Sequence, residues 1–242
     1  MTELPLKDRV ALVTGASRGI GAALAIELAT LGAHCVLVAR TQGGLEETDD
    51  AIRAATGRGA TLLPFDLQKQ DKELDLLGAS IMERFGRLDI LVHNAGVLNK
   101  LTPVPHIDPR DWAETVAVNL TAAWRLIRSC DPPLRASDAG RAVFVTTGRV
   151  LRPKAYWGMY GATKAGMEHL VETWAQEVAK TPLRVNLADP GIVATKMREQ
   201  AMPGEDPASL PRPADIAPAL AALCLPAETR HGARIEIEAP AR

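Results

Sequence analysis

Short apolar runs and longer stretches with helical periodicity alternate along the whole chain. Seven runs rich in β-branched and aliphatic residues predict strands, at Arg9–Thr14, Cys35–Ala39, Thr61–Phe65, Ile90–Val92, Ala142–Thr146, Arg184–Ala188 and Arg234–Glu238. Most of these runs are continuously apolar, which is typical of strands that helices cover on both faces.

The residues between the runs repeat their apolar positions with the period of a helix. In the stretch Ile20–Leu31, Leu24, Leu28 and Leu31 share one stripe. The stretch Met159–Ala179 has a similar stripe, made of Met167, Leu170, Val171, Trp174 and Val178. Connections of this length between strands indicate parallel pairing and right-handed crossovers.

The pattern therefore predicts an α/β fold, with one doubly wound, seven-stranded parallel sheet of the Rossmann type and helices on both faces. No repeat, low-complexity tract or linker divides residues 1–242, so we expect a single domain that carries both a cofactor site and a substrate site. The proline-rich segment Pro203–Pro218 predicts an irregular surface excursion, and we expect an irregular substrate loop at about 196–213.

Composition excludes several classes of protein. Lys and Arg total 28 and Asp and Glu 29, and the net charge of −1 argues against a nucleic-acid binder and a polybasic membrane anchor. The three cysteines form no CxxC pair and the five histidines are dispersed, so we expect neither disulfides nor a metal site. The start of the chain lacks the pattern of a signal peptide, and no apolar run approaches the roughly 20 residues that span a bilayer, so we expect a soluble, cytoplasmic protein.

A glycine-rich turn, Thr14–Gly21, follows the first predicted strand and precedes a helix. Gly15, Gly19 and Gly21 allow the backbone to turn tightly and approach a pyrophosphate, and the helix N-terminus offers free N–H groups. Such glycines can also serve only a tight connection. Their position after the first strand of a parallel sheet nevertheless favours dinucleotide binding.

Further motifs follow in order along the chain. They are His93-Asn-Ala-Gly96, Asn119 within Val-Ala-Val-Asn-Leu, Tyr160-Gly-Ala-Thr-Lys164, and Pro190-Gly191 followed by Thr195. Together with the glycine spacing Gly-xxx-Gly-x-Gly, they resemble the short-chain dehydrogenase/reductase family from Arg9 to about Gly232, with His93 in place of the family's first Asn. A closer likeness, to a bacterial branch of uncharacterised oxidoreductases, includes Trp157-Gly-Met-Tyr160 and supplies no substrate.

The resemblance implies hydride transfer between a nicotinamide dinucleotide and a carbonyl or secondary alcohol. It assigns the acid/base role to Tyr160, contact with the nicotinamide ribose to Lys164, and a water that links Lys164 to solvent to Asn119. Four residues apart on a helix, Tyr160 and Lys164 share a face, and a nearby ammonium lowers the pKa of a phenol from about 10. We expect the cofactor to contact Gly15, Ser17, Arg18, Gly19, Ile20, Gly21, Arg40, Asp66, Leu67, Asn94, Ala95, Gly96, Tyr160, Lys164, Pro190, Gly191, Val193 and Thr195.

Thr147 departs from the family pattern, which has Ser thirteen residues before the tyrosine. A Thr hydroxyl can still orient a substrate oxygen, although its methyl group takes up room beside the carbonyl. We expect catalysis to survive this change. The alternative is that Thr146 and Thr147 are ordinary strand residues in a protein that has lost activity.

The end of the second predicted strand bears on the choice of dinucleotide. An NAD site usually has an acidic residue there, whereas this chain has Ala39 followed by Arg40. With Arg18 in the glycine turn, Arg40 can bind a 2′-phosphate, so we expect a preference for NADP(H), with NAD(H) possible. Either arginine could instead be a solvated surface charge. Asp66 can contact adenine, as in the family, or cap a helix.

Three segments are expected to form the substrate wall, Leu98–Thr102, Gly148–Trp157 and Lys196–Leu210. Trp157 can flank the pocket or pack elsewhere. Arg149, Arg152 and Lys154 form a basic cluster beside Thr147, which we interpret as a solvated loop or, alternatively, as a site for an acidic or phosphorylated substrate carrier.

These observations lead to an NADP(H)-dependent carbonyl reductase or alcohol dehydrogenase that acts on a small molecule, without nucleic-acid or membrane partners. A 3-oxoacyl-thioester reductase and a non-catalytic dinucleotide-binding regulator remain as alternatives, and Thr147 alone supports the regulator. The resemblance implies a homodimer or homotetramer. The tail Ile235–Arg242 lacks the Gly-Gly that the family often has, which puts the usual C-terminal interface in doubt.

Overall fold

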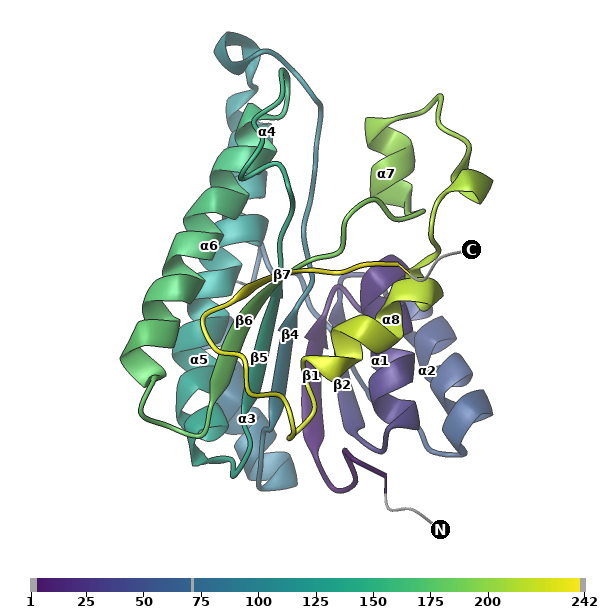
Figure 1. Cartoon of the computed structure of the whole chain (residues 1–242), viewed down its shortest axis with the longest axis vertical. Coiled ribbons are helices and arrows are strands. Elements are labelled where there is room, and N and C mark those ends of the chain that lie inside the picture. The colour runs from purple at the N-terminus through teal and green to yellow at the C-terminus, as the bar shows by residue number, and fades with distance from the viewer. Residues whose placement is uncertain (1–3, 71, 240–242) are drawn as a thin grey trace.

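The central layer of the protein is one parallel sheet with the strand order β3-β2-β1-β4-β5-β6-β7 (Figure 1). The computed structural model describes residues 4–70 and 72–239. All neighbouring strands are parallel, which confirms the predicted fold class. The strands are β1 (Val10–Thr14), β2 (His34–Ala39), β3 (Thr61–Pro64), β4 (Ile90–His93), β5 (Arg141–Val145), β6 (Arg184–Asp189) and β7 (Arg234–Glu236).

Each predicted strand is present, and its ends differ from the prediction by at most two residues. The largest difference is in β7, which ends at Glu236, two residues before the predicted Glu238. Met1–Glu3 and Pro240–Arg242, which belong to the expectations about a signal peptide and the tail, lie outside the described residues.

Helices cover both faces of the sheet (Figure 1). They are α1 (Gly19–Thr30), α2 (Gln42–Thr56), α3 (Leu74–Phe85), α4 (Pro109–Val116), α5 (Ala122–Ala136), α6 (Gly158–Val178), α7 (Lys196–Ala201) and α8 (Pro213–Ala222). A π-helical turn, Ala117–Thr121, joins α4 to α5. Within the described ranges, no helix has both the length and the apolar character needed to cross a membrane.

Two hydrophobic cores lie on opposite faces of the sheet. Val10 and Leu12 of β1 belong to the core that α3, α5 and α6 complete. Ala11 and Val13 belong to the core shared with α1, α2 and α8. Since successive strand residues point to opposite faces, β1 is apolar at both sets of positions, and this explains the continuous apolar runs in the sequence.

Helix α8 lies in a segment that we predicted to be irregular. Pro213 occupies its first position, where a missing N–H is not needed, and the Asp215 carboxylate accepts the Arg212 amide at 2.8 Å. Pro218 removes one backbone hydrogen bond inside the helix, but Ile216 and Leu220 are buried in the core shared with α1. Tertiary burial outweighs the low helix propensity of proline, so the prediction was wrong for residues 213–218.

The expected irregular substrate loop at 196–213 also begins with a helix, α7. Thr195 caps this helix, because its hydroxyl accepts the Arg198 amide at 3.1 Å. The predicted loop is therefore helical over Lys196–Ala201, and a 3₁₀ turn follows at Pro207–Ser209.

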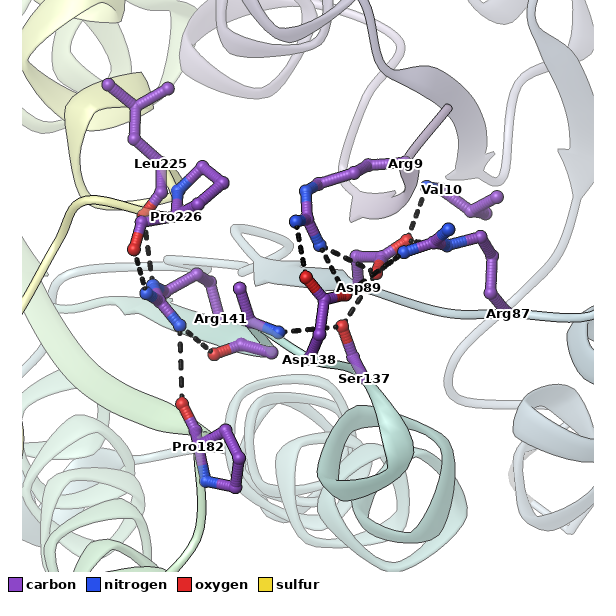
Figure 2. A network of polar contacts seen from close by, with 12 residues as sticks. Arg9, Val10, Arg87, Asp89, Ser137, Asp138, Arg141, Pro182, Leu225 and Pro226 are labelled. Carbon is purple, nitrogen blue, oxygen red and sulfur yellow. Dashed lines mark hydrogen bonds and ion pairs between the residues drawn. The ribbon is translucent and has the colours of Figure 1, made fainter. Parts of the chain in front are cut away.

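At the amino end of the sheet, a network of ion pairs surrounds Asp89 (Figure 2). The buried Asp89 carboxylate accepts hydrogen bonds from Arg87 at 2.7 Å, from Arg9 at 3.1 Å and from the Ser137 hydroxyl at 2.6 Å. The Val10 amide donates to it at 2.9 Å. Burial by itself would raise the pKa of Asp89, but these hydrogen bonds outweigh it and hold the pKa below its ordinary value.

In the same region, the Arg141 guanidinium is bound by backbone carbonyls and not by a carboxylate (Figure 2). Its buried guanidinium donates to the backbone carbonyls of Leu225 at 3.0 Å, Pro226 at 2.6 Å and Gly140 at 2.7 Å. These contacts tie the first residue of β5 to the segment that leads from α8 toward β7.

Substitution of Asp89 by Asn should lower the free energy of unfolding by about 3 kcal/mol at pH 7, because Arg9 and Arg87 lose a buried partner. Asp138→Asn is the matched control. Asp138 contacts the same two arginines, but its side chain is 69 % exposed, so we expect a loss of about 1 kcal/mol or less. Urea denaturation measures both values.

The difference in free energy of unfolding between wild type and Asp89→Asn should also depend on pH. The pKa of Asp89 is lower in the folded chain than in the unfolded one, so its contribution is complete above the unfolded value of about 3.9. The contribution is then lost as the pH falls through the folded value. Equal stability of the two Asn variants at pH 7 would contradict the central role of Asp89.

Candidate functional site

A cavity of about 1120 Å³ opens at the carboxyl ends of the strands. This is the edge at which open parallel sheets bind ligands. Predicted site residues that line it are Gly15, Ser17, Arg18, Gly19, Ile20, Arg40, Leu67, Asn94, Ala95, Gly96, Thr147, Tyr160, Lys164, Pro190, Gly191, Val193 and Thr195. Gly21, Asp66 and Asn119 are not part of the lining.

The glycine turn runs close to the loop after β4. Gly15 has a φ of +66°, and a Cβ atom on it would lie 2.8 Å from Asn94 Nδ2. A Cβ on Gly21 would lie 2.3 Å from the Gly15 carbonyl oxygen. Gly21 therefore allows α1 to pack against the turn, whereas Gly15 and Gly19 line the cavity.

The Thr14 hydroxyl links β1 to the loop after β4. It accepts the Asn94 amide at 3.2 Å and the Ala95 amide at 3.1 Å, and it lies 3.0 Å from His93 Nδ1. The Asn94 side chain in turn donates to the carbonyls of Thr14 and Gly15, both at 3.2 Å. The glycine turn and the Asn-Ala-Gly segment are thereby held as one unit.

His93 stands where the resembling family has Asn, and its ring is fully buried. Since the Thr14 hydroxyl already accepts two amides, its hydrogen goes to His93 Nδ1, and the ring proton is on Nε2. Burial, together with the charge of Lys164, lowers the pKa of His93 to about 3. Nε2 has no hydrogen-bond partner within the described part of the chain. His93 is therefore a neutral, structural ring.

Tyr160 and Lys164 lie on one face of α6, and both are buried. Lys164 Nζ donates to the Val145 carbonyl at 2.7 Å. Burial raises the pKa of Tyr160 above its ordinary value, and the Asp189 carboxylate adds to this effect. Burial lowers the pKa of Lys164 to about 8, against the opposing charge of Glu168. We expected Lys164 to lower the pKa of Tyr160, but the pKa is raised, because burial disfavours the charged phenolate.

Thr146 and Thr147 lie just beyond the end of β5, not within it. The buried Thr146 hydroxyl donates to the Glu168 carboxylate. The Thr147 hydroxyl accepts the Arg149 amide at 3.3 Å and lines the cavity. Thr146 lines the cavity as well, but its hydroxyl hydrogen is bound to Glu168, so the Thr147 hydroxyl is the better placed of the two to donate to a ligand.

Asn119 lies in the π-helical turn between α4 and α5, and its side chain is fully buried. Its Oδ1 accepts the Val97 amide at 2.8 Å, and its Nδ2 donates to the Val97 carbonyl at 2.9 Å. A Cβ on Gly96 would lie 3.4 Å from Asn119 Oδ1 and 3.8 Å from Lys164 Nζ. The Asn119 side chain thus fixes the loop that passes beside Lys164.

Arg40 extends from the end of β2 toward α4. Its Nη1 lies 3.5 Å from Glu114 Oε1, and the guanidinium side chain is half exposed. Arg18 is exposed and forms no ion pair within the described residues. The sequence did not point to Glu114, because it is 74 positions from Arg40 and belongs to another element.

Asp66 caps a turn and not a helix, because α3 begins only at Leu74 with Glu73 as its N-cap. Its Oδ1 accepts the amides of Gln68 at 3.0 Å and Lys69 at 3.4 Å, so it closes the turn after β3. Its neighbours Phe65 and Leu67 line the cavity instead.

A buried group of charges that the sequence analysis missed lies beside Tyr160. Arg234 of β7 donates to Asp189 at 2.8 Å and to Glu168 at 3.2 Å. Asp189 also accepts the Gly191 amide at 3.1 Å, and it lines the cavity. Residues this far apart in the chain give no local signal, since only the pairing of β6 with β7 brings them together.

The predicted substrate wall contributes to the cavity. Trp157, whose position was left open, lines it and meets the Tyr160 ring edge to face, with ring centres 6.0 Å apart. Arg149 and Arg152 also line the cavity, whereas Lys154 does not.

Helix α7 is attached to the loop after β4. Gln200 Nε2 donates to the Asn99 carbonyl at 3.0 Å, and the Asn99 side chain donates to Thr115 at 3.0 Å. Gln200 and Asn99 both line the cavity, so this contact joins two of the three segments predicted to form the substrate wall.

Comparison with known proteins gives a consistent result. The sequence model of a family described as short chain dehydrogenase matches residues 9–206. The oxidoreductase YciK of Escherichia coli K12 is 37 % identical over 214 residues, which cover 88 % of this chain and 84 % of YciK. A Mycobacterium tuberculosis protein (strain CDC 1551) named NAD-dependent oxidoreductase is 34 % identical over 206 residues, 80 % of this chain and 74 % of its own.

Among solved structures, a short chain dehydrogenase of Shigella flexneri 2a, complexed with NADP, is similar throughout. It superimposes with a TM-score of 0.92 at 34 % identity, and the match covers 97 % of this chain and 99 % of the other.

Substitution of Gly21 by Ala should weaken the binding of a nicotinamide dinucleotide by at least about tenfold and destabilise the fold by about 1–3 kcal/mol. The new Cβ would lie 2.3 Å from the Gly15 carbonyl oxygen and 2.5 Å from Asn94 Nδ2, so the turn would have to shift. Gly43→Ala is the control, since a Cβ there has no neighbour within 4 Å and should stabilise α2 by up to about 1 kcal/mol. Dinucleotide titration and urea denaturation measure the two effects, and unchanged binding in Gly21→Ala would disprove the packing role.

Proposed function

The chain belongs to the short-chain dehydrogenase family of oxidoreductases, and on this basis we propose that it transfers a hydride between NADP(H) and a carbonyl or secondary alcohol. One observation carries the proposal. Tyr160 and Lys164 are buried together on α6, at the wall of the cavity that the glycine turn also lines. A single domain would hold both the cofactor and the small-molecule substrate.

The lining of the cavity fits a dinucleotide. The free N–H groups at the start of α1 would bind the pyrophosphate, and no side chain caps this helix end. Gly96 would leave room for the nicotinamide beside Lys164 Nζ, which can donate to ribose hydroxyls. A bound nicotinamide supplies or accepts the hydride.

The residues of the chain would supply the proton and hold the substrate. The Tyr160 hydroxyl would donate its proton to a carbonyl oxygen as hydride arrives, and its raised pKa keeps that proton in place until then. The Thr147 hydroxyl has no acceptor for its hydrogen within the described residues, so it can donate to the same oxygen. Asn119 would act through Val97 by fixing the adjacent loop.

A preference for NADP(H) is supported by charge at the end of β2. Ala39 offers no carboxylate to repel a 2′-phosphate, and Arg40 with Arg18 can bind one. The similar Shigella flexneri structure is complexed with NADP, whereas the Mycobacterium tuberculosis relative is named NAD-dependent. Glu114 opposes the preference, because it pairs with Arg40 and adds negative charge nearby.

From the same family resemblance we infer a homodimer or homotetramer in the cytoplasm. Sedimentation of the purified protein tests the assembly.

Tyr160→Phe should reduce NADPH-dependent reduction by about 10²–10⁴-fold and leave NADPH binding almost unchanged, since only the proton donor is removed. The assay is NADPH oxidation with a panel of ketones, aldehydes and 3-oxoacyl thioesters. Tyr156→Phe is the matched control, because Tyr156 is 57 % exposed and does not line the cavity. Undiminished turnover in Tyr160→Phe would refute the assignment. NADPH binding without turnover of any carbonyl in wild type would favour the regulator.

Wild-type protein should bind NADPH more tightly than NADH, and Arg40→Ala should weaken NADPH binding by about 10- to 100-fold, because a hydrogen-bonded charge is lost. NADH binding should change little in this variant. Glu114→Gln should tighten NADPH binding, since it frees Arg40 from its present partner. Fluorescence titration measures the dissociation constants, and tighter binding of NADH by wild type would overturn the preference.

A further inference from the structure

Among the cations of the substrate wall that line the cavity, three have no carboxylate partner within the described residues. They are Arg149, Arg152 and Lys196, and all three line the cavity. Three of the four acidic residues that line the same cavity pair with other arginines. Asp189 and Glu236 pair with Arg234 at 2.8 and 3.3 Å, and Glu114 pairs with Arg40. The substrate wall therefore has an excess of positive charge.

Among the three cations, Arg149 is held in place. Its guanidinium carbon lies 5.5 Å from the centre of the Trp157 ring, a distance at which a cation is attracted to an aromatic face. Its one side-chain hydrogen bond is a long one, from Nη1 to the Arg152 carbonyl at 3.5 Å. A guanidinium has five N–H donors, so most of those on Arg149 are free to bind a ligand.

Arg149 is also tied to the residues proposed to carry the reaction. Its backbone amide donates to the Thr147 hydroxyl, and the Trp157 ring under its guanidinium meets the Tyr160 ring. Only one aromatic ring thus separates the free guanidinium from the phenol. An anion bound to Arg149 would therefore lie on the same wall of the cavity as Tyr160.

We propose that Arg149 binds a carboxylate of the substrate itself, which makes the substrate a short oxo acid or the corresponding hydroxy acid. This inference rests on the proposed function. The planar guanidinium matches a carboxylate with two parallel hydrogen bonds, and the Trp157 ring holds it in position before binding. A carrier phosphate fits less well, because in a coenzyme A thioester the whole pantetheine arm separates it from the carbonyl.

The test compares 4-oxopentanoate and 5-oxohexanoate with their methyl esters, and with 3-oxobutanoyl coenzyme A, as substrates for NADPH-dependent reduction. Wild type should prefer one of the acids over its ester by about 10- to 100-fold in kcat/KM. Arg149→Met keeps the packing on Trp157 and should lose this preference, while the rates with esters stay nearly constant. Arg149→Lys should recover part of it. Lys154→Met, in the same segment but outside the cavity lining, should behave as wild type.

Binding of pentanoate and pentanamide to the NADPH complex, measured by calorimetry, gives a readout that needs no turnover. Pentanoate should bind more tightly than the amide in wild type and lose this advantage in Arg149→Met. If Arg149→Met lowers kcat/KM equally for acids and esters, Arg149 has only a packing role. If the variant lowers kcat/KM for the coenzyme A thioester alone, Arg149 binds a phosphate of the carrier. Either result overturns the inference. Failure to reduce any carbonyl contradicts the proposed function, while the pentanoate measurement still decides the carboxylate site.

Discussion

Between β1 and β4 the order of the strands in the sheet departs from their order in the chain, and the loops after these two strands lead to helices on opposite faces. The Thr14 hydroxyl and the Asn94 side chain hold this junction together with four hydrogen bonds. Gly15 can then approach the loop so closely that a Cβ atom would not fit. The position of the cavity follows from this junction, because ligands bind where such loops separate.

Buried charges are ion-paired or hydrogen-bonded at both ends of the sheet, and at the carboxyl end Arg234 pairs with Asp189 and Glu168. At the amino end, Asp89 collects Arg9 and Arg87, and the carbonyls around Arg141 satisfy its guanidinium (Figure 2). At the carboxyl end, Lys164 is buried against a carbonyl, and Arg149 stacks on an aromatic ring without a carboxylate partner among the described residues. Structural charges are thus paired inside the fold, while unpaired positive charge remains where an anionic cofactor or substrate can meet it. The net charge of −1 conceals this separation.

Sequence patterns predicted the regular elements well, because burial on both faces of a parallel sheet leaves apolar runs that can be read directly. They failed at α8, where proline suggested a loop and the packing of Ile216 and Leu220 decided for a helix. Most of the predicted site residues line one cavity, because the carboxyl ends of parallel strands lie at the same edge of the sheet. The contacts of Arg40 with Glu114, and of Arg234 with Asp189 and Glu168, join distant positions and could not be predicted.

The sequence by itself determined the fold class, the family and the spacing that sets Tyr160 and Lys164 on one helical face, because these depend on local periodicity and on short motifs. Only the tertiary structure decided how those groups titrate and which charges stay free. Burial raises the pKa of Tyr160 and lowers that of Lys164 to about 8, although the sequence suggested that their proximity would dominate. Desolvation and ion pairing depend on what surrounds a side chain in three dimensions, and those neighbours come from residues far away in the chain.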